Sequence, residues 1–336
     1  MNETTPVSWS LISPFVIFIV EGSIMCIGNG LIAATVLSNK SLRNRKEMLL
    51  MAGLAAADFI YGSGTFLAGL LRLILAMQNK LNYLVTSWDC MLFPSTSPLC
   101  IGQETVGLMA VFISIDRYLA VAHFATYRSL GVKYAYRILF FVFTYGIIIG
   151  ACQFLASYYL TERIADKKQV CLGPTAVPGW FQGVDSNLTA VFGYLSVVIY
   201  IGVYLVFRKH MRRSTTDEFG NDDPRRTRQM EMQRRVTVTL GIVTFFTFIF
   251  YCAPIAYTSI ASYLNIPFNS SLIWTLTRIN SIVNIFIYLV RQQELRRAMI
   301  SLLLCRPAVT TGTVLPQQVQ VHSGTRRIPS NSEVQK

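Results

Sequence analysis

The sequence predicts an all-α integral membrane protein: a bundle of seven transmembrane helices with a short amphipathic helix after the seventh span. Hydrophobic residues make up 52% of the 336 residues and charged residues only 14%, a more apolar balance than soluble domains usually have. The apolar residues also gather in uncharged runs of about 20 residues, the length of helix that crosses a bilayer.

These runs place the spans in order along the chain. An uncharged stretch at residues 236–277 is about twice the length of a span, and Asn265, Pro267 and Asn269 in its middle favour a turn. The stretch is therefore expected to hold span six and the start of span seven, which ends near Val290. The first five spans are expected at residues 11–37, 48–77, 88–122, 138–160 and 187–207.

Three regions follow from these spans. Residues 1–10 are expected to form an extracellular tail and residues 11–305 the membrane domain with its amphipathic helix. Residues 306–336 are rich in Ser, Thr, Gln and Val without periodicity, so we expect a disordered cytoplasmic tail. Cys305 is a candidate for palmitoylation, although an idle free thiol explains it nearly as well.

The basic residues indicate the orientation in the cell membrane. Most of the 30 Lys and Arg residues lie in the segments after spans one, three, five and seven, which all fall on one side. By the positive-inside rule this side is cytoplasmic, so the N-terminus is extracellular and the C-terminus is cytoplasmic. Three sequons are then expected outside as candidate glycosylation sites, at Asn2, Asn187 and Asn269.

Several functional classes are excluded. The net charge of +13 could suggest a nucleic-acid partner, but the long uncharged runs and 12% aromatic residues indicate a lipid bilayer instead. The seven Cys and three His do not show zinc-ligand spacing, and no nucleophile elbow or nucleotide-binding loop is present. We therefore expect no enzyme, no structural metal and no organic cofactor.

Polar residues at membrane depth are costly and are therefore candidates for a functional site. A carboxylate faced by several amides and hydroxyls suits a hydrated monovalent cation or a proton-linked switch. A purely structural polar network explains the same residues about as well. The set consists of Asn29, Asp58, Asn280, Asn284 and Tyr288.

Asp116, Arg117 and Tyr118 come at the expected inner end of span three. Arg117 can pair locally with Asp116 and, once released, can reach polar groups of spans five to seven or an inserted partner helix. The pair would then act as a two-state latch; the alternative is an ordinary charge pair at a helix end. Candidate acceptors for the released guanidinium are Tyr200, Tyr204 and Tyr288.

The segment Ser114-Ile-Asp116-Arg117-Tyr118-Leu-Ala-Val121 resembles the DRY box that closes the third helix of rhodopsin-like (class A) G-protein-coupled receptors. Asn29, Leu54–Asp58, Tyr251-Cys-Ala-Pro254 and Asn284…Tyr288 occupy the family's landmark places in other spans. The resemblance covers roughly residues 10–305, and within the family the chain is most similar to the serpentine Srsx-like chemoreceptors of nematodes.

The resemblance implies an extracellular ligand, which would be a small chemical cue or a peptide, and a heterotrimeric G protein as cytoplasmic partner, with arrestin as a further one. It also implies an activation hinge at Phe248, Cys252 and Pro254. Cys252 stands where the family usually has a Trp, and Ile285 where it has a Pro. Arg278 lies about where opsins carry their retinal-binding Lys, and a guanidinium cannot form that Schiff base, which excludes a light receptor.

A disulfide is expected on the extracellular side. Cys90 is expected at the outer start of span three and Cys171 in the second outer loop, so an oxidising compartment favours a bridge between them. The resemblance implies the same disulfide.

The candidate ligand pocket contains Gln103, Glu104 and Arg278 in the outer half of the bundle. Glu104 and Arg278 could form a buried structural pair, or one of them could be the counter-charge for an ionised ligand. Glu21 is a further candidate partner for Arg278, and Arg72 could line the same vestibule. The alternative function is a seven-span transporter or ion channel, in which Asp58, Glu104 and Arg278 would be pathway charges.

Overall fold

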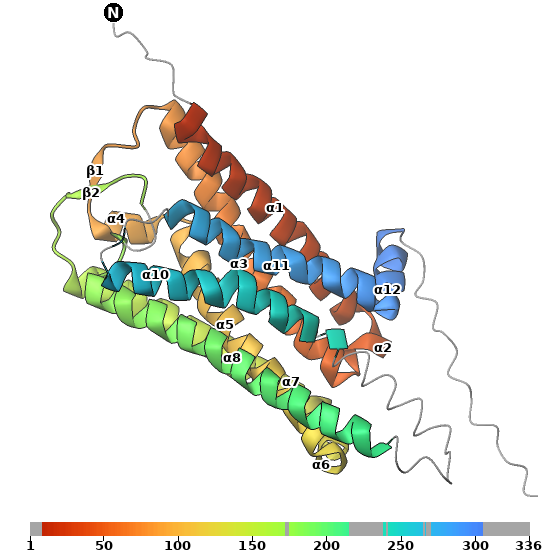
Figure 1. Ribbon diagram of the computed structural model, residues 1–336. Coiled ribbons are helices and arrows are strands. Elements are labelled where there is room, and N and C mark those ends of the chain that lie inside the picture. The colour runs from red at the N-terminus through yellow and green to blue at the C-terminus, as the bar shows by residue number, and fades with distance from the viewer. Residues whose placement is uncertain are drawn as a thin grey trace, which may run out of the picture.

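The computed structural model describes residues 9–171, 175–214, 238–239, 241–264, 266 and 270–304. Within these ranges seven helices are long and apolar enough to cross a membrane, which confirms the predicted fold class. Figure 1 shows them packed along a common long axis. They are α1 (Trp9–Ser38), α3 (Lys46–Met77), α5 (Thr96–Ala122), α7 (Val132–Leu160), α8 (Gly179–Ser214), a sixth helix that includes η2 (Phe248–Cys252) and α10 (Ala253–Tyr263), and α11 (Ser270–Arg291).

Glycines allow α1 and α3 to pack closely. A Cβ atom on Gly22 would lie 2.4 Å from the backbone nitrogen of Phe66, and one on Gly69 would lie 2.8 Å from the backbone nitrogen of Ile19. No side chain fits at either place, and small residues of this kind are the usual means by which membrane helices approach each other. The contact fixes the relative positions of the helices that carry Asn29 and Asp58.

The third membrane helix begins later than the sequence predicts. We expected the span to start at residue 88, but Cys90 belongs to a separate short helix, α4 (Ser87–Leu92), and α5 begins at Thr96. Phe93 is extended (φ −60°, ψ 132°), as expected of a residue before a proline. Pro94 therefore separates the disulfide cysteine from the membrane helix.

Two short strands depart from the all-α prediction at this end of the bundle. β1 (Leu84–Val85) pairs antiparallel with β2 (Lys167–Lys168) and joins the segment before α4 to the one after α7. We call this end, which carries the Cys90–Cys171 disulfide, the disulfide end. The opposite end, where α5 carries Arg117, is the Arg117 end.

Three shorter helices lie at the Arg117 end (Figure 1): α2 (Lys40–Arg43), α6 (Phe124–Ser129) and α12 (Gln293–Leu303). α12 follows the seventh span and buries Leu295 while Arg296 and Arg297 stay exposed, so the predicted amphipathic helix is present. Arg45, just before α3, forms an ion pair with Glu294 of α12.

A π-helical turn interrupts the sixth helix just before Pro254. The N–H of Ala253 bonds the carbonyl of Phe248, five residues earlier, where an α-helix would bond four residues back. Pro254 has no N–H, so this turn lacks one of its donors. The wider turn directs Tyr251 towards a cavity inside the bundle, which it lines.

The fourth and fifth membrane helices are longer than the sequence predicts, and some predicted sites lie outside the described residues. α7 and α8 extend beyond the expected spans into charged and polar segments, and Asn187 lies within α8 rather than at its start. The candidate glycosylation sites Asn2 and Asn269, the thiol of Cys305 and the C-terminal tail lie outside the described residues.

Candidate functional site

A buried ion pair lies near the end of α5. Asp116 and Arg117 are each 1% exposed. The Nε of Arg117 donates to Oδ2 of Asp116 at 2.9 Å, and Nη2 of Arg117 contacts the same oxygen. Because the two charges are shielded from water, breaking this pair without providing a new partner for Arg117 would be costly.

Tyr127 of α6 closes the pair from outside the membrane helices. Its hydroxyl accepts a hydrogen bond from Nη2 of Arg117 at 2.7 Å, and its proton is shared between Asp116 Oδ2 at 3.3 Å and Glu47 Oε1 at 3.4 Å. Burial raises the pKa of the Tyr127 hydroxyl well above its usual value, so the hydroxyl stays protonated. We call Asp116, Arg117 and Tyr127 the Arg117 cluster; the sequence analysis missed Tyr127.

Lys46 at the start of α3 fixes the position of Tyr127. Its ammonium group donates to the carbonyl oxygens of Tyr127 at 2.5 Å and Leu130 at 2.9 Å. The same ammonium lies 3.5 Å from the centre of the Tyr127 ring, a cation–π geometry. Arg45 and Lys46, two neighbouring residues, therefore tie α3 to α12 and α6.

Tyr118 does not join the cluster. Its side chain is 37% exposed, and its ring makes an edge contact with His123. Of the candidate acceptors for a released Arg117, Tyr204 is 57% exposed, whereas Tyr200 and Tyr288 are buried. Tyr200 packs against Gly241 of the sixth helix.

The structure brings the predicted polar residues of α1, α3 and α11 into the same buried region. Asp58 Oδ1 accepts a hydrogen bond of 2.6 Å from Ser281, a residue that the sequence analysis did not select. Within the described part of the chain, Asp58 Oδ2 has no hydrogen-bond partner, and the same holds for polar side-chain atoms of Asn29, Asn280, Asn284 and Tyr288.

A cavity runs beside this polar region. Ser114 of α5 and Asn280, Asn284 and Tyr288 of α11 line one part of it. Its remaining walls come from α3, α5, α8 and the sixth helix, including Gly107, Gly193, Thr247 and Tyr251. The cavity therefore connects the helices that carry the polar network with those that would have to move to release Arg117.

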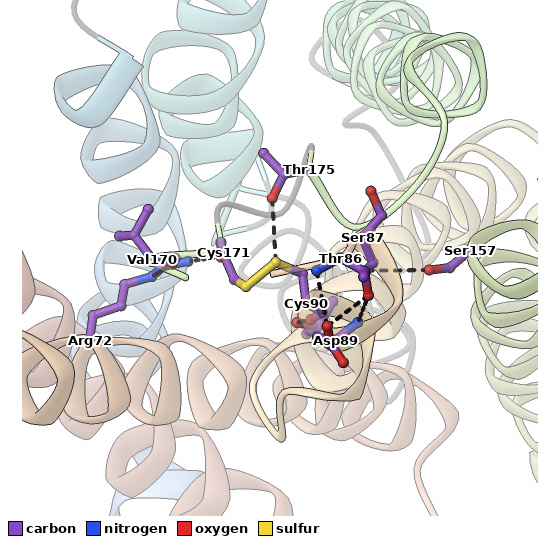
Figure 2. Close-up of a disulfide and its surroundings, with 10 residues drawn as sticks. Arg72, Thr86, Ser87, Asp89, Cys90, Ser157, Val170, Cys171 and Thr175 are labelled. Atoms are coloured by element: carbon purple, nitrogen blue, oxygen red, sulfur yellow. Dashed lines mark hydrogen bonds between the residues drawn. A yellow bond between two sulfur atoms is a disulfide. The ribbon is translucent and has the colours of Figure 1, made fainter. Parts of the chain in front are cut away.

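The disulfide end is held by a covalent bond and by a buried guanidinium. Cys90 and Cys171 form the predicted disulfide. Arg72 of α3 donates to the carbonyl oxygens of Val170 at 2.9 Å and Cys171 at 2.8 Å. Figure 2 shows Arg72 reaching the loop on one side of the disulfide and Thr175 bonding the sulfur of Cys90 at 3.9 Å on the other. Arg72 thus anchors the loop and is 7% exposed.

Glu104 and Arg278 have different partners. Arg278 pairs with Glu21 of α1 through a 2.5 Å contact and lies over the ring of Phe18. Glu104 accepts hydrogen bonds from Tyr145 of α7 and Thr189 of α8. Arg278 is therefore paired with Glu21 and not with Glu104.

The residues of the expected hinge lie on different faces of the sixth helix. Cys252 is 2% exposed and Pro254 is buried, but Phe248 is 48% exposed on the surface of the bundle. Tyr194 of α8 donates to the carbonyl oxygen of Cys252 at 3.1 Å. The side chain that lines the cavity at the π-helical turn is Tyr251, which the sequence analysis quoted in a motif but did not select.

Seven apolar helices, a disulfide at one end and a buried Asp–Arg pair at the other define a seven-transmembrane receptor. Residues 28–289 match the family model described as 7 transmembrane receptor (rhodopsin family). This match covers more than half of the chain, which therefore belongs to the rhodopsin family of seven-transmembrane receptors. The protein is a class A G-protein-coupled receptor, a multi-pass membrane signalling protein and not an enzyme, and the family acts through ligands and G proteins.

Proposed function

We propose that the Arg117 end faces the cytoplasm and that the Arg117 cluster holds the receptor inactive until a ligand bound at the disulfide end releases it. The observation that carries this proposal is the burial of Arg117 in contact with Asp116 and Tyr127. A guanidinium held in this way can act as a switch, because a small movement of the helices exchanges its hydrogen-bond partners. The charge itself is already present in both states.

The cavity suggests how the two ends communicate. A ligand that moves α8 or the sixth helix at the disulfide end would change the walls of the cavity at Gly193 and Tyr251. The same helices would then move at the other end, where Tyr200 and Tyr288 can accept Arg117. The end of the bundle that carries Arg117 would bind a heterotrimeric G protein, with arrestin as a later partner.

The proposal also covers the orientation in the membrane, the class of ligand and a bound cation. The basic residues at the Arg117 end support a cytoplasmic location for that end. The ligand is proposed to be a small chemical cue or a peptide, and the receptor a chemoreceptor of the Srsx-like kind. Asp58 Oδ2, buried without a hydrogen-bond partner in the described residues, fits a monovalent cation held together with Ser281.

The alternative of a transporter or channel finds less support. Its three pathway charges have separate partners: Asp58 contacts Ser281, Glu104 contacts Thr189 and Arg278 contacts Glu21. None of the three lines the cavity described above. A transport pathway would require these charges to face a common aqueous route.

The proposal predicts that Arg117→Ala abolishes agonist-dependent and basal G-protein signalling while surface expression persists. The reason is that Arg117 is assigned to contacts with the G protein and with the switch rather than with the ligand. A cell-based G-protein reporter, combined with surface labelling, measures both quantities. Arg128→Ala, which removes an exposed arginine of the nearby α6, is the matched control. Normal signalling by Arg117→Ala would rule out the proposed switch.

A further inference from the structure

Two carboxylic residues, Glu104 of α5 and Asp185 of α8, flank the hydroxyl of Thr189 in the disulfide-end half of the bundle: the hydroxyl contacts Oε1 of Glu104 and donates to the backbone carbonyl oxygen of Asp185. Glu104 comes eight residues after the start of α5, and Asp185 comes six residues after the start of α8. At 1.5 Å per residue these positions lie roughly 12 Å and 9 Å below the ends of their helices. Both depths are within reach of a ligand that enters from the disulfide end.

The neighbours of these carboxylates are hydroxyl and amide groups. Glu104 Oε2 accepts from the hydroxyl of Tyr145 at 3.3 Å, and Oε1 accepts from Thr189. Asp185 Oδ1 accepts from the amide nitrogen of Gln153 at 3.2 Å. We call these five residues the acidic cluster.

Acceptors outnumber donors in the acidic cluster. The hydroxyl of Thr189 has one proton, yet it faces both Glu104 and the carbonyl oxygen of Asp185, the latter at 3.0 Å. Gln153 is only 2% exposed, and among the described residues its amide oxygen has no hydrogen-bond partner, although its amide nitrogen bonds Asp185. The cluster therefore contains a buried acceptor without a donor, beside the two carboxylates.

The charge of the cluster is also not balanced. Among the ion pairs of the described residues, none involves Glu104 or Asp185. The other buried charges of this half are arranged differently, because Arg278 has Glu21 and Arg72 has two carbonyl oxygens. Glu104 is fully buried and Asp185 is half-buried, and carboxylates in such a setting are stabilised by a cation that also supplies hydrogen-bond donors.

We propose that the acidic cluster binds the protonated amine of the extracellular ligand, with Glu104, Asp185 and the amide oxygen of Gln153 as its acceptors. A primary ammonium group supplies three N–H donors, one for each of these acceptors, and its single positive charge reduces the unpaired negative charge of the cluster from two to one. This inference rests on the proposed function as a ligand-activated receptor and names the chemistry of its ligand.

The position of Tyr251 links the acidic cluster to the rest of the receptor. Its buried hydroxyl has no hydrogen-bond partner in the described residues, and its ring packs against Gly193 of α8, the helix that carries Asp185. Tyr251 also lines the cavity that extends to Asn284 and Tyr288. An amine that binds Asp185 therefore contacts the helix against which Tyr251 packs, at the π-helical turn of the sixth helix.

The test uses the full-length receptor purified into lipid nanodiscs, with n-butylammonium as the probe in a constant excess of sodium chloride. The shift of the thermal unfolding midpoint with probe concentration gives the affinity. We expect a saturable increase with n-butylammonium and no increase with n-butanol, which has no charge, or with tetramethylammonium, which has no N–H donor.

Variants then locate the site. Asp185→Asn should weaken n-butylammonium binding by about thirtyfold or more, the cost of removing one partner of a buried charge pair. Gln153→Leu keeps the charge of the cluster but removes the unpartnered oxygen, and it should weaken n-butylammonium binding several-fold. This variant tests the site if Asp185→Asn does not fold. Glu162→Gln, which neutralises an exposed carboxylate after α7, should bind as the unmodified receptor does.

Glu104→Gln separates ligand recognition from a structural role. In the absence of amine this variant should be at least as stable as the unmodified receptor, because it removes a buried negative charge that has no ion-pair partner among the described residues, but it should lose the response to n-butylammonium. A large loss of stability without amine would instead show that the carboxylate is structural and would overturn the inference.

Failure of the inference and failure of the proposed function are distinguishable. Basal nucleotide exchange on a G protein, measured in the same nanodiscs, depends on the Arg117 cluster and not on the amine. The inference is overturned if n-butylammonium has no effect, if n-butanol or tetramethylammonium acts equally well, or if Asp185→Asn and Gln153→Leu both respond normally, whether or not nucleotide exchange is present.

Discussion

The hydroxyl of Tyr127 is the group that joins the charges of the Arg117 cluster to the segment between α5 and α7. It receives a hydrogen bond from Arg117 and offers its own proton to Asp116 or Glu47. Because the ring is held from the other side by Lys46, the hydroxyl has little freedom to turn away. At the scale of single residues, the closed state of the proposed switch would therefore depend on one hydroxyl outside the membrane helices.

Tyr127→Phe should raise basal G-protein activation about fivefold. The substitution keeps the ring and its contact with Lys46 but removes one hydrogen bond to Arg117, and a hydrogen bond of this kind contributes about 1 kcal/mol. Nucleotide exchange without agonist measures the change, normalised to surface expression. Tyr136→Phe removes a hydroxyl from a side chain that is 47% exposed on α7 and should have no effect. Unchanged or lower basal activity of Tyr127→Phe would contradict a closing role.

The sequence indicated Asp116 and Arg117 because they are neighbours in the chain. It could not indicate Tyr127, because the contact depends on how the segment after α5 folds back, and nothing in Phe124–Ser129 distinguishes one aromatic residue from another. The same limit explains Ser281, an ordinary hydroxyl residue whose bond to Asp58 joins positions 223 residues apart.

At the scale of elements, the pair of Glu21 and Arg278 ties α1 to α11 across 257 residues of sequence. Both residues are less than 10% exposed, and Phe18 covers the guanidinium. From the sequence, two carboxylates, Glu21 and Glu104, remained candidate partners for Arg278. Depth along a helix follows from sequence, whereas the direction in which a side chain faces depends on helix rotation and packing.

Removing one member of this pair should destabilise the receptor strongly. Glu21→Gln and Arg278→Gln should each lower the free energy of unfolding by roughly 3–5 kcal/mol, because each leaves a buried charge without its partner. The double variant should lose much less than the sum of the two. Thermal unfolding of the purified variants measures the coupling, with the exposed Arg296→Gln as control. Additive losses would mean that the two side chains do not act as a pair.

The disulfide and Arg72 act on the same loop at the disulfide end. Cys90→Ser and Cys171→Ser should each reduce surface delivery sharply, and the double variant should be no worse than either single one, as expected for two halves of one bond. Surface labelling of intact cells gives the result. Cys152→Ser, which changes an exposed free cysteine, should behave as the unmodified receptor. A further loss in the double variant would indicate separate roles for the two cysteines.

At the scale of the whole molecule, sequence and structure agree on the number and order of membrane helices, because uncharged runs of spanning length leave few alternatives in lipid. They differ where the chain leaves the membrane: α5 begins after Pro94, two short strands pair at the disulfide end, and α8 extends to Ser214. These features depend on local caps, a proline and solvent-exposed segments, which a pattern of hydrophobicity does not determine.

We propose above all that release of Arg117 from Asp116 switches the receptor on. The most direct measurement is nucleotide exchange on a panel of purified heterotrimeric G proteins by the receptor in nanodiscs, without any ligand. Asp116→Asn removes the charge that holds Arg117 and should raise the exchange rate several-fold on at least one heterotrimer, and adding Arg117→Ala to it should abolish that gain. Equal rates for the unmodified receptor, Asp116→Asn and the double variant on every heterotrimer would contradict the account.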